Sequence, residues 1–487
     1  MSDASQATVA IVGGGLAGLA AGCALADCGF RVRLYEKRPY LGGRASSYQL
    51  PGTSETVDNC QHLLLGCCTN LLGFYRQIGV EDKISWYERY TFLEPGGRSS
   101  ELRPGILPAP LHTATSFLRS HALGIADKMG IARAMMALLR GIPPDDGRPF
   151  TAWLARHPQT ELAVQRFWKP VLVSALNEDL ERVSTSYACQ VFRESFLKSA
   201  EAARIGLPAL PLSALYGAAG EYIRGRGGEV RLRATVDSFR ADRGAVRLGC
   251  AGNEEAADYA VLAVPFQALE RALPPDAPAP LRAMLAGFQT SPTTGIHFWF
   301  DREVTDLPHA VLLDRTIQWM FNKSQILGGT NAAADNLAAE ARAPEEGESA
   351  APPPGAHARQ HLELVVSSSK ALVDKSRGEI LEIARRELIE FFPRAAQAQV
   401  MRATVIKEVH ACFSPAPGID RIRPNATTAW PRVFLAGDWT ATGWPATMEG
   451  AVRSGYLAAE AITRAAGRER RFLLPDLPAA GLMRLFG

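Results

Sequence analysis

Three glycines near the N-terminus restrict what this 487-residue chain can fold into more than any other feature. An apolar run over residues 9–12 is followed by Gly13, Gly15 and Gly18, in the spacing G-x-G-x-x-G, and then by an alanine- and leucine-rich stretch that ends near Cys28. In this pattern the first glycine permits a tight turn, the second lets a phosphate approach the backbone, and the third lets a helix pack closely on a strand. The stretch therefore predicts a strand, a turn and a helix whose N-terminus binds a dinucleotide phosphate.

A second strand and an acidic residue complete the dinucleotide pattern. Residues 31–35 are predicted to form this strand, and Glu36 ends it at the place where a carboxylate binds ribose hydroxyls. Gly42, Gly43 and Arg44 then add a second glycine pair and a cation. The resulting arrangement E-x5-G-G-R resembles FAD enzymes of the flavin amine oxidase and phytoene desaturase superfamily more than NAD dehydrogenases. This resemblance implies that the dinucleotide is FAD.

Another motif lies in the last third of the chain, over residues 433–462. Its sequence indicates a strand, the pair Gly437 and Asp438, a loop, and a helix that begins around Met448. The superfamily resemblance implies that this pair contacts the pyrophosphate and ribityl chain, and that the helix N-terminus faces the flavin ring. It also implies that a residue near Val236 packs on the adenine. The residues predicted to bind FAD are Gly13, Gly15, Leu16, Ala17, Gly18, Glu36, Lys37, Gly42, Gly43, Arg44, Val236, Gly437, Asp438, Thr447, Met448 and Ala451.

The cysteines bear on how FAD is held and on metals. Cys412 precedes Gly437 at roughly the distance of the flavin-linking cysteine of some amine oxidases, but its Gly-Gly-Cys-Tyr context is missing. We therefore expect non-covalent FAD. The eight cysteines include no C-x-x-C pair or zinc-type spacing, so no metal site is predicted.

The chain is long enough for two domains that interleave along the sequence. We predict a fold of the α/β and α+β classes, in which a Rossmann-like FAD-binding domain interleaves with a mixed sheet and helical substrate domain. A second G-x-G-x-x-G is absent after residue 211, which argues against a separate NAD(P) domain. The predicted parts are residues 1–84, 211–290 and 400–466 for FAD binding, 85–210 and 291–399 for the substrate domain with a helical cap, a flexible insertion at 328–360, and a C-terminal tail at 467–487.

Composition excludes some classes of partner. A net charge of +3 is too small to predict nucleic-acid binding, although it is compatible with weak attraction to an anionic membrane surface. The chain begins with polar residues, and it has no apolar run of about 18 residues. We expect a cytoplasmic protein without a spanning helix, with contact at the inner face of the membrane as an open alternative.

Several strings resemble one family, the hydroxysqualene dehydroxylases, also called squalene-associated FAD-dependent desaturases. This resemblance covers nearly the full length. It implies reductive removal of the allylic hydroxyl of hydroxysqualene to give squalene in bacterial hopanoid synthesis, with a long-chain isoprenoid substrate and an unidentified electron donor for FAD. The strings are DNCQHLLLGCCTNLL at 58–72, LPAPLH at 107–112, ALN at 175–177, QWMFN at 318–322 and GDWTATGWPATMEGAVRSG at 437–455.

A polar cluster at residues 58–62 supplies the candidate catalytic groups. We predict that a protonated His62 donates a proton to the departing water, that Asp58 raises the pKa of His62 or orients it, and that Gln61 binds the hydroxyl. The alternative is that these side chains only brace the flavin loop. Six further side chains are predicted either to line an isoprenoid tunnel or to form ordinary core: Phe167, Trp168, Trp299, Trp319, Met320 and Phe321.

Two segments leave the question of membrane contact open. Residues 113–140 carry apolar residues at helical spacing with interspersed basic residues, which indicates either a core-packing helical pair or an amphipathic pair that faces a membrane. The tail at 467–487 is equally compatible with docking and with membrane contact.

Three other functions fit the same fold. A phytoene-type desaturase or isomerase would keep the flavin but reverse the direction of electron flow. An amine oxidase requires an aromatic cage and a flavin lysine, which the sequence does not place. A non-enzymatic isoprenoid-binding protein, like the GDP dissociation inhibitors of prenylated GTPases, would carry no flavin.

Overall fold

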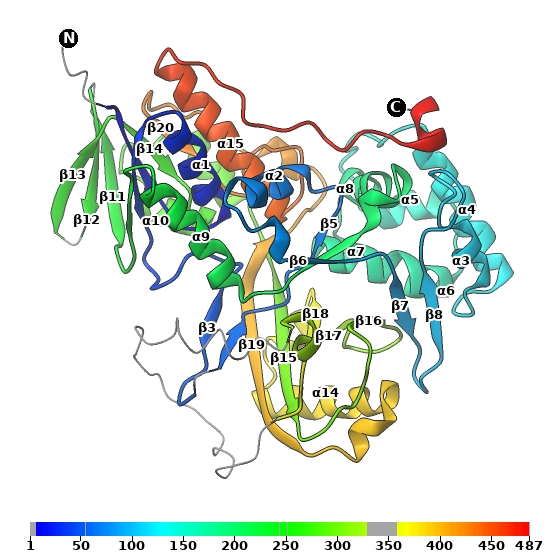
Figure 1. Ribbon diagram of the computed structural model, residues 1–487. Helices are drawn as coiled ribbons and strands as arrows, with labels where there is room; N and C mark the ends of the chain where they lie inside the picture. Colours follow the sequence, from blue (N-terminus) through cyan, green and yellow to red (C-terminus); the bar gives the residue numbers. More distant parts are fainter. Residues whose placement is uncertain (1–5, 54, 243, 251, 329–357, 487) are drawn as a thin grey trace.

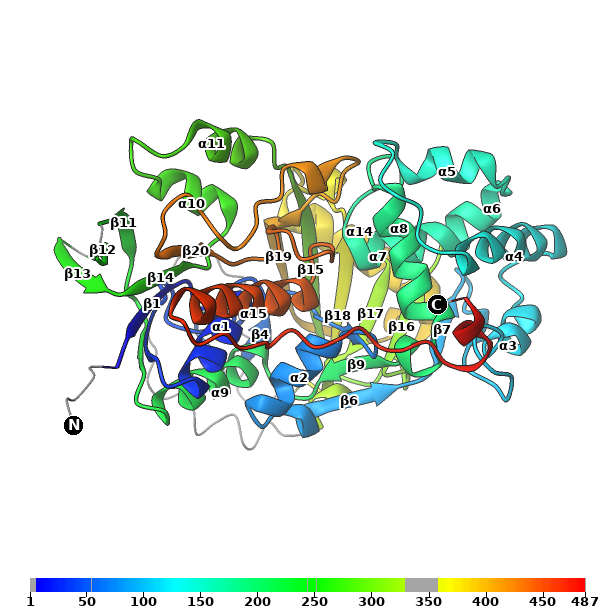
Figure 2. The same cartoon turned by 90° about the horizontal axis from the view of Figure 1, so that it is seen from above.

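The structure is a computed structural model that describes residues 6–53, 55–242, 244–250, 252–328 and 358–486. Most of the predicted insertion at 328–360 lies outside these residues. A parallel sheet lies at one end of the molecule, a larger mixed sheet in the middle, and a group of helices at the other end (Figures 1 and 2). This arrangement confirms the predicted α/β and α+β class.

The parallel sheet is built from distant parts of the chain in the order β10-β2-β1-β14-β20. Each pair of neighbouring strands is parallel. Since parallel strands need crossover connections, helices cover the faces of the sheet. The strands are β1 (Thr8–Val12), β2 (Arg31–Tyr35), β10 (Glu229–Arg231), β14 (Tyr259–Leu262) and β20 (Val433–Leu435), and the helices that pack beside them are α1 (Leu16–Asp27), α9 (Leu212–Arg224) and α15 (Met448–Ala465).

Helices α1 and α15 lie side by side on this sheet although about 430 residues separate them (Figure 2). Their backbones approach so closely that a Cβ atom at Gly455 would lie 2.2 Å from the carbonyl oxygen of Ala17. On the other side of α1, a Cβ at Gly22 would lie 2.8 Å from Ile223 of α9. Small residues therefore hold the two ends of the chain in one layer.

The larger sheet has seven strands in the order β19-β15-β18-β17-β16-β7-β8. Strand β19, which the sequence analysis assigns to the FAD-binding part, belongs instead to this sheet, because it pairs along its length with β15. Helix α14 (Arg377–Phe391) packs against the seven-stranded sheet through a cluster of buried apolar side chains. The strands are β7 (Tyr90–Leu93), β8 (Ser99–Leu102), β15 (Thr290–Phe300), β16 (His309–Leu312), β17 (Trp319–Asn322), β18 (Gln360–Ser367) and β19 (Val400–Phe413).

Smaller elements connect the sheets. After Arg44, strands β3 (Ser47–Gln49) and β4 (Thr56–Asp58) form an antiparallel hairpin. The sequence analysis does not predict several of the short strands, among them β5, β8, β9, β13 and β16; β13 is a short, charged edge strand without apolar alternation. The remaining elements are β5 (Leu64–Leu65), α2 (Thr69–Gln77), β6 (Ile84–Tyr87), β9 (Ile205–Pro208), β11 (Val236–Ala241), β12 (Val246–Cys250), β13 (Asn253–Ala257), α10 (Phe266–Ala272), α11 (Ala279–Ala286) and α12 (Lys323–Ile326).

The helical end of the molecule falls within the stretch predicted to form a cap. Its core is aromatic: Trp168 is fully buried and contacts the rings of Phe150, Trp153 and Phe192. Two of its helices, α3 and α4, form the pair expected in residues 113–140. The helices are α3 (Ala114–Arg119), α4 (Ile125–Leu139), α5 (Phe150–Arg156), α6 (Glu161–Ala163), α7 (Lys169–Leu176) and α8 (Thr185–Phe192).

The C-terminal tail runs along the surface from α15 to the helical end (Figure 2). The amide of Leu474 donates to Asn70 Oδ1 at 2.8 Å, and the amide of Leu482 donates to the carbonyl of Ala109 at 2.8 Å. Met483 is buried. The tail is therefore docked, as one of the two alternatives predicts. None of the described helices combines the length and the hydrophobicity that crossing a bilayer requires.

The close approach of α1 and α15 yields a matched pair of stability predictions. Gly455→Ala is expected to lower the free energy of unfolding by about 1–3 kcal/mol, because the new methyl group meets backbone that cannot move aside. Gly217→Ala, in the middle of α9 where nothing lies within 4 Å, is expected to raise it by up to about 1 kcal/mol through helix propensity. Thermal unfolding of the two variants measures both effects; equal shifts of one sign would contradict the packing argument.

Candidate active site

A single large cavity of about 1170 Å³ extends from the parallel sheet, along the seven-stranded sheet, into the helical end. Fifteen of the sixteen residues predicted to bind the dinucleotide line it; the exception is Gly18. The two sequence motifs, which lie at opposite ends of the chain, therefore face one space.

The glycine-rich turn has the shape that its sequence pattern predicts. Gly13 has φ +111°, and a Cβ there would lie 2.4 Å from the carbonyl oxygen of Ala263. A Cβ at Gly18 would lie 2.0 Å from the carbonyl oxygen of Gly13, so Gly18 acts through packing and not through the cavity. Gly15 is the N-cap residue of α1, which has no side-chain cap and no acidic residue in its first turn. The first N–H groups of α1 thus remain available to an anion in the cavity.

Glu36 is buried at the end of β2, at the wall of the cavity. Its Oε2 accepts from the amide of Gly14 at 2.7 Å, and its Oε1 accepts from the amide of Arg38 at 2.8 Å. Because a carboxylate has about four acceptor positions, these two bonds fix the side chain and leave capacity for hydroxyl groups. The expected ribose-binding role of Glu36 fits this geometry.

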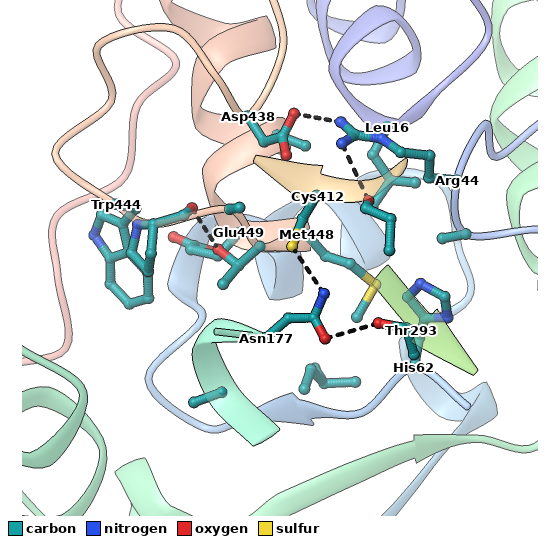
Figure 3. A pocket seen from close by; sticks show the side chains of 18 of the residues that line it. Leu16, Arg44, His62, Asn177, Thr293, Cys412, Asp438, Trp444, Met448 and Glu449 are labelled. Atoms are coloured by element: carbon teal, nitrogen blue, oxygen red, sulfur yellow. Dashed lines mark hydrogen bonds and ion pairs between the residues drawn. The ribbon is translucent and has the colours of Figure 1, made fainter. Parts of the chain in front are cut away.

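Arg44 joins the two halves of the site (Figure 3). Its guanidinium donates to Asp438 and, at 3.2 Å, to the carbonyl of Ala411. Burial by itself would lower the pKa of Arg44, but the attraction of Asp438 outweighs burial and raises it. The N-terminal and C-terminal motifs are thus linked by a charge pair at the cavity wall.

The start of α15 lies at the far wall of the cavity. Thr447 caps the helix, since its Oγ1 accepts from the amide of Gly450 at 3.1 Å. The next residue, Met448, points into the cavity (Figure 3). Glu449 is fully buried and accepts from the amide of Leu71 at 2.7 Å, which fixes α15 against α2. The orientation of this helix end is therefore set by packing and capping before any ligand binds.

The three predicted catalytic residues do not act as one group. Gln61 and His62 line the cavity, whereas Asp58 lies behind its wall. Asp58 accepts from Ser47 Oγ at 2.6 Å and from Lys323 Nζ at 2.7 Å, and the attraction of Lys323 overcomes the effect of burial and lowers the pKa of Asp58. The prediction that Asp58 orients His62 is therefore wrong, because its oxygens are held by other partners.

His62 is held by a different contact. Its Nδ1 lies 2.8 Å from the carbonyl oxygen of Cys60, so Nδ1 carries the proton and Nε2 is left as an acceptor. Burial lowers the pKa of His62, and the Cys60 carbonyl and the Asp58 charge do not reverse this. At neutral pH the imidazole is neutral, which corrects the prediction of a protonated donor.

Asn177 is a cavity residue to which the sequence analysis gives no role, although it ends the string ALN. It follows α7 in the left-handed conformation, at φ 51°. Its Oδ1 accepts from Thr293 Oγ1 at 2.8 Å and from the amide of Ser368 at 2.7 Å, and its Nδ2 lies 3.3 Å from Cys412 Sγ (Figure 3). One side chain therefore joins the helical end to β15, to β19 and to the residue that follows β18. The signal in the sequence is an asparagine just after an apolar helix.

The helical end of the cavity is apolar. Three of the six candidate tunnel residues line it, namely Phe167, Trp319 and Phe321. Met320 lies on the opposite face of β17, as the two-residue period of a strand requires. Trp168 and Trp299 do not line the cavity and pack in the interior. Alternation along β17 is the signal that separates lining residues from core.

Comparison with known proteins identifies the family. The model for "Flavin containing amine oxidoreductase" matches residues 16–463. The 15-cis-phytoene desaturase of Synechococcus elongatus is 28% identical, over 93% of this chain and 95% of its own length. The zeta-carotene desaturase of a Synechocystis species is 26% identical, over 93% of this chain and 96% of its own.

Solved structures share the fold. An oxidoreductase from Methanosarcina mazei has a TM-score of 0.69 at 16% identity and covers 94% of this chain and 100% of its own. Putrescine oxidase bound to putrescine has a TM-score of 0.65 at 17% identity, covering 95% and 99%.

The groups that line the cavity fit FAD. A free helix N-terminus suits a diphosphate, the Glu36 carboxylate suits a ribose, and an apolar strip beyond Met448 suits a ring system. A Cβ at Gly15 would meet only Gly43, at 3.8 Å, so the backbone is open to a close-lying group. The chain belongs to the flavin-containing amine oxidoreductase family and has FAD as its cofactor.

Proposed function

We propose that this protein is an FAD-dependent oxidoreductase of a long-chain isoprenoid. The observation that carries the proposal is the continuity of the cavity, which passes from the residues that hold FAD to an apolar chamber lined by side chains such as Phe117, Phe167 and Trp319. When bound, FAD supplies two-electron redox chemistry. The chamber binds a hydrocarbon chain and excludes water from the reacting carbons.

The first candidate reaction is reductive removal of the allylic hydroxyl of hydroxysqualene to give squalene, as in hopanoid biosynthesis. The strings DNCQH and GWPATMEGA support it, and most residues of both line the cavity, Gln61, His62 and Met448 among them. In this reaction the Nε2 of His62 accepts a hydrogen bond from the substrate hydroxyl, and Gln61 lies beside it. These contacts orient the hydroxyl. Its departure as water takes up one proton, and the new C–H bond takes up one hydride; reduced FAD, when bound, would supply both. An electron donor, which is not identified, returns FAD to its reduced state.

The second candidate is desaturation of a carotenoid precursor. The relatives that support it are a phytoene desaturase and a zeta-carotene desaturase, each matched over nearly the whole chain. The neutral state of His62 also suits it, because a free Nε2 can accept a proton.

An anaerobic experiment separates the two candidates. The protein is reduced, mixed with hydroxysqualene, and followed by flavin absorbance and product analysis. We expect flavin reoxidation with formation of squalene, and we expect His62→Ala to keep the flavin band while losing about 100-fold or more in rate, since the substrate hydroxyl loses its acceptor. Failure to convert hydroxysqualene, together with turnover of phytoene by the oxidised protein, would select desaturation.

We propose that FAD is bound without a covalent link. Burial raises the pKa of the Cys412 thiol to about 11, although the hydrogen bond from Asn177 Nδ2 to its sulfur opposes this, so the thiol stays protonated and poorly nucleophilic. Acid precipitation is expected to release all the yellow colour into the supernatant. Colour retained in the pellet would contradict non-covalent binding.

We also propose that the substrate enters from the inner face of a membrane. Helices α3 and α4 present Phe117 and Met135 to the cavity and other apolar side chains to the outside. The docked tail adds its own exposed side chains to the same end of the molecule. Arg119 of α3 and Arg133 of α4 lie on the same helices and are the proposed partners of anionic lipid headgroups. The exposed side chains are Ile106, Leu107, Leu111, Leu118, Ile125, Met129, Met136, Leu482, Leu485 and Phe486.

Vesicles that contain anionic phospholipid test this surface. The double variant Leu118→Asp/Ile125→Asp is expected to bind at least about tenfold more weakly, because each side chain contributes about 2 kcal/mol of apolar burial. Leu232→Asp, which also replaces an exposed leucine by an acidic residue but lies outside this surface, is the control and should bind as the wild type does. Equal binding of all three proteins in a co-sedimentation assay would refute the proposal.

A further inference from the structure

A cluster of buried charges lies behind the cavity wall, against the segment 58–62. Lys323 begins α12, Asp58 ends β4, and Glu363 lies in β18. Their side chains are only 3%, 3% and 0% exposed. Charged groups are rarely buried to this extent unless they are paired, so the cluster calls for a physical explanation.

The ammonium group of Lys323 is the centre of this cluster. Its Nζ donates to Asp58 Oδ2 at 2.7 Å and to Gln61 Oε1 at 2.8 Å, and it lies 3.6 Å from Glu363 Oε2. Gln61 in turn donates from Nε2 to the carbonyl of His62 at 3.1 Å. A single cation therefore binds two side chains of the segment, Asp58 and Gln61, and through Gln61 it reaches the backbone of His62, whose side chain lines the cavity.

The other titratable groups around the cluster are uncharged or more distant. His297 of β15 and His361 of β18 lie 3.1 Å apart, and burial lowers the pKa of both, to about 3 for His297. Burial raises the pKa of the Cys60 thiol well above its usual value. Glu408 of β19 binds Asn59 Nδ2 at 3.2 Å and adds negative charge from the far side of the segment.

One cation thus faces two carboxylates in a dry environment. Burial raises the pKa of Glu363 to about 8, and Lys323 opposes this only in part. The pKa of Asp58 is lowered by the same Lys323. At neutral pH the cluster is neutral, with an ionised Asp58, a charged Lys323 and a protonated Glu363, which is the state that burial favours.

We propose that Lys323 is a positioning residue for the cavity-facing segment 58–62, and that Glu363 makes this positioning dependent on pH. When Glu363 loses its proton, its carboxylate attracts Lys323 Nζ, which lies 3.6 Å from Glu363 Oε2, and draws it away from Gln61 Oε1 at 2.8 Å. The Gln61 amide is then released, and the side chains of Gln61 and His62 lose their fixed places at the wall. The inference concerns this chain's own residues and holds for either candidate reaction.

Glu363→Gln provides the first test. With the isoprenoid that the wild type converts, turnover of the wild type is expected to fall as pH rises through about 8, and this alkaline fall should disappear in Glu363→Gln. The control is Glu390→Gln, a half-buried carboxylate paired with Arg315, which should keep the wild-type profile. An alkaline fall that persists unchanged in Glu363→Gln would overturn the role of Glu363.

A second measurement needs no substrate, so it separates failure of this inference from failure of the proposed function. Because the pKa of Glu363 is raised in the folded state, its proton stabilises the fold at low pH, and this contribution is lost as pH rises from about 4.5 to about 8. The apparent unfolding temperature of Glu363→Gln should therefore decline less than that of the wild type over this interval. Identical slopes would contradict the inference even if no isoprenoid is turned over.

Lys323 is tested by removing it with and without its partner. Lys323→Met leaves a buried anion at Asp58 and is expected to unfold or to lose FAD, whereas the double variant Asp58→Asn/Lys323→Met removes both charges. The double variant should retain the flavin band but lose about 100-fold in kcat with little change in KM, since Gln61 is no longer held. Lys83→Met, at an exposed pair with Asp82, is the control. Wild-type kcat in the double variant would refute the positioning role.

Discussion

The close contact between the first and last helices of the parallel sheet is the constraint on which the site depends. Gly455 lets α15 approach α1 until no Cβ fits between them, and this approach places the start of α15 beside the glycine-rich turn. Arg44 and Asp438 then join the two motifs by charge. Without this packing, the helix N-termini and the Glu36 carboxylate would not converge on one cavity.

Electrostatics and burial divide the cavity into two regions. At the parallel sheet, backbone amides, Glu36 and Arg44 give a polar wall that suits a charged dinucleotide. Toward the helical end the wall is formed by aromatic and aliphatic side chains, with Asn177 and His62 at the boundary. The transition from polar to apolar fits an enzyme that brings a flavin to a hydrocarbon, because water is excluded where the chain lies.

The boundary residues show why some predictions failed. The polar character of the segment 58–62 led to the prediction of a site there, and two of its three candidates line the cavity. The orienting role of Asp58 was wrong because its partner Lys323 is 265 residues away and no local sequence pattern predicts that pair, although the charge of Asp58 does act to raise the pKa of His62. The protonation of His62 was wrong for a related reason: burial, which lowers its pKa, is a property of the surrounding fold.

The sequence by itself determined the local elements and the cofactor class, because strand, turn and helix signals and glycine spacing act over a few residues. Alternation along β17 also lies in the sequence, and it separates Trp319 and Phe321 from Met320. Only the tertiary structure decided which sheet takes β19 and which cation meets Asp58. Strand pairing and buried charge pairs join segments far apart in the chain, so their energies depend on geometry that no short stretch of sequence contains.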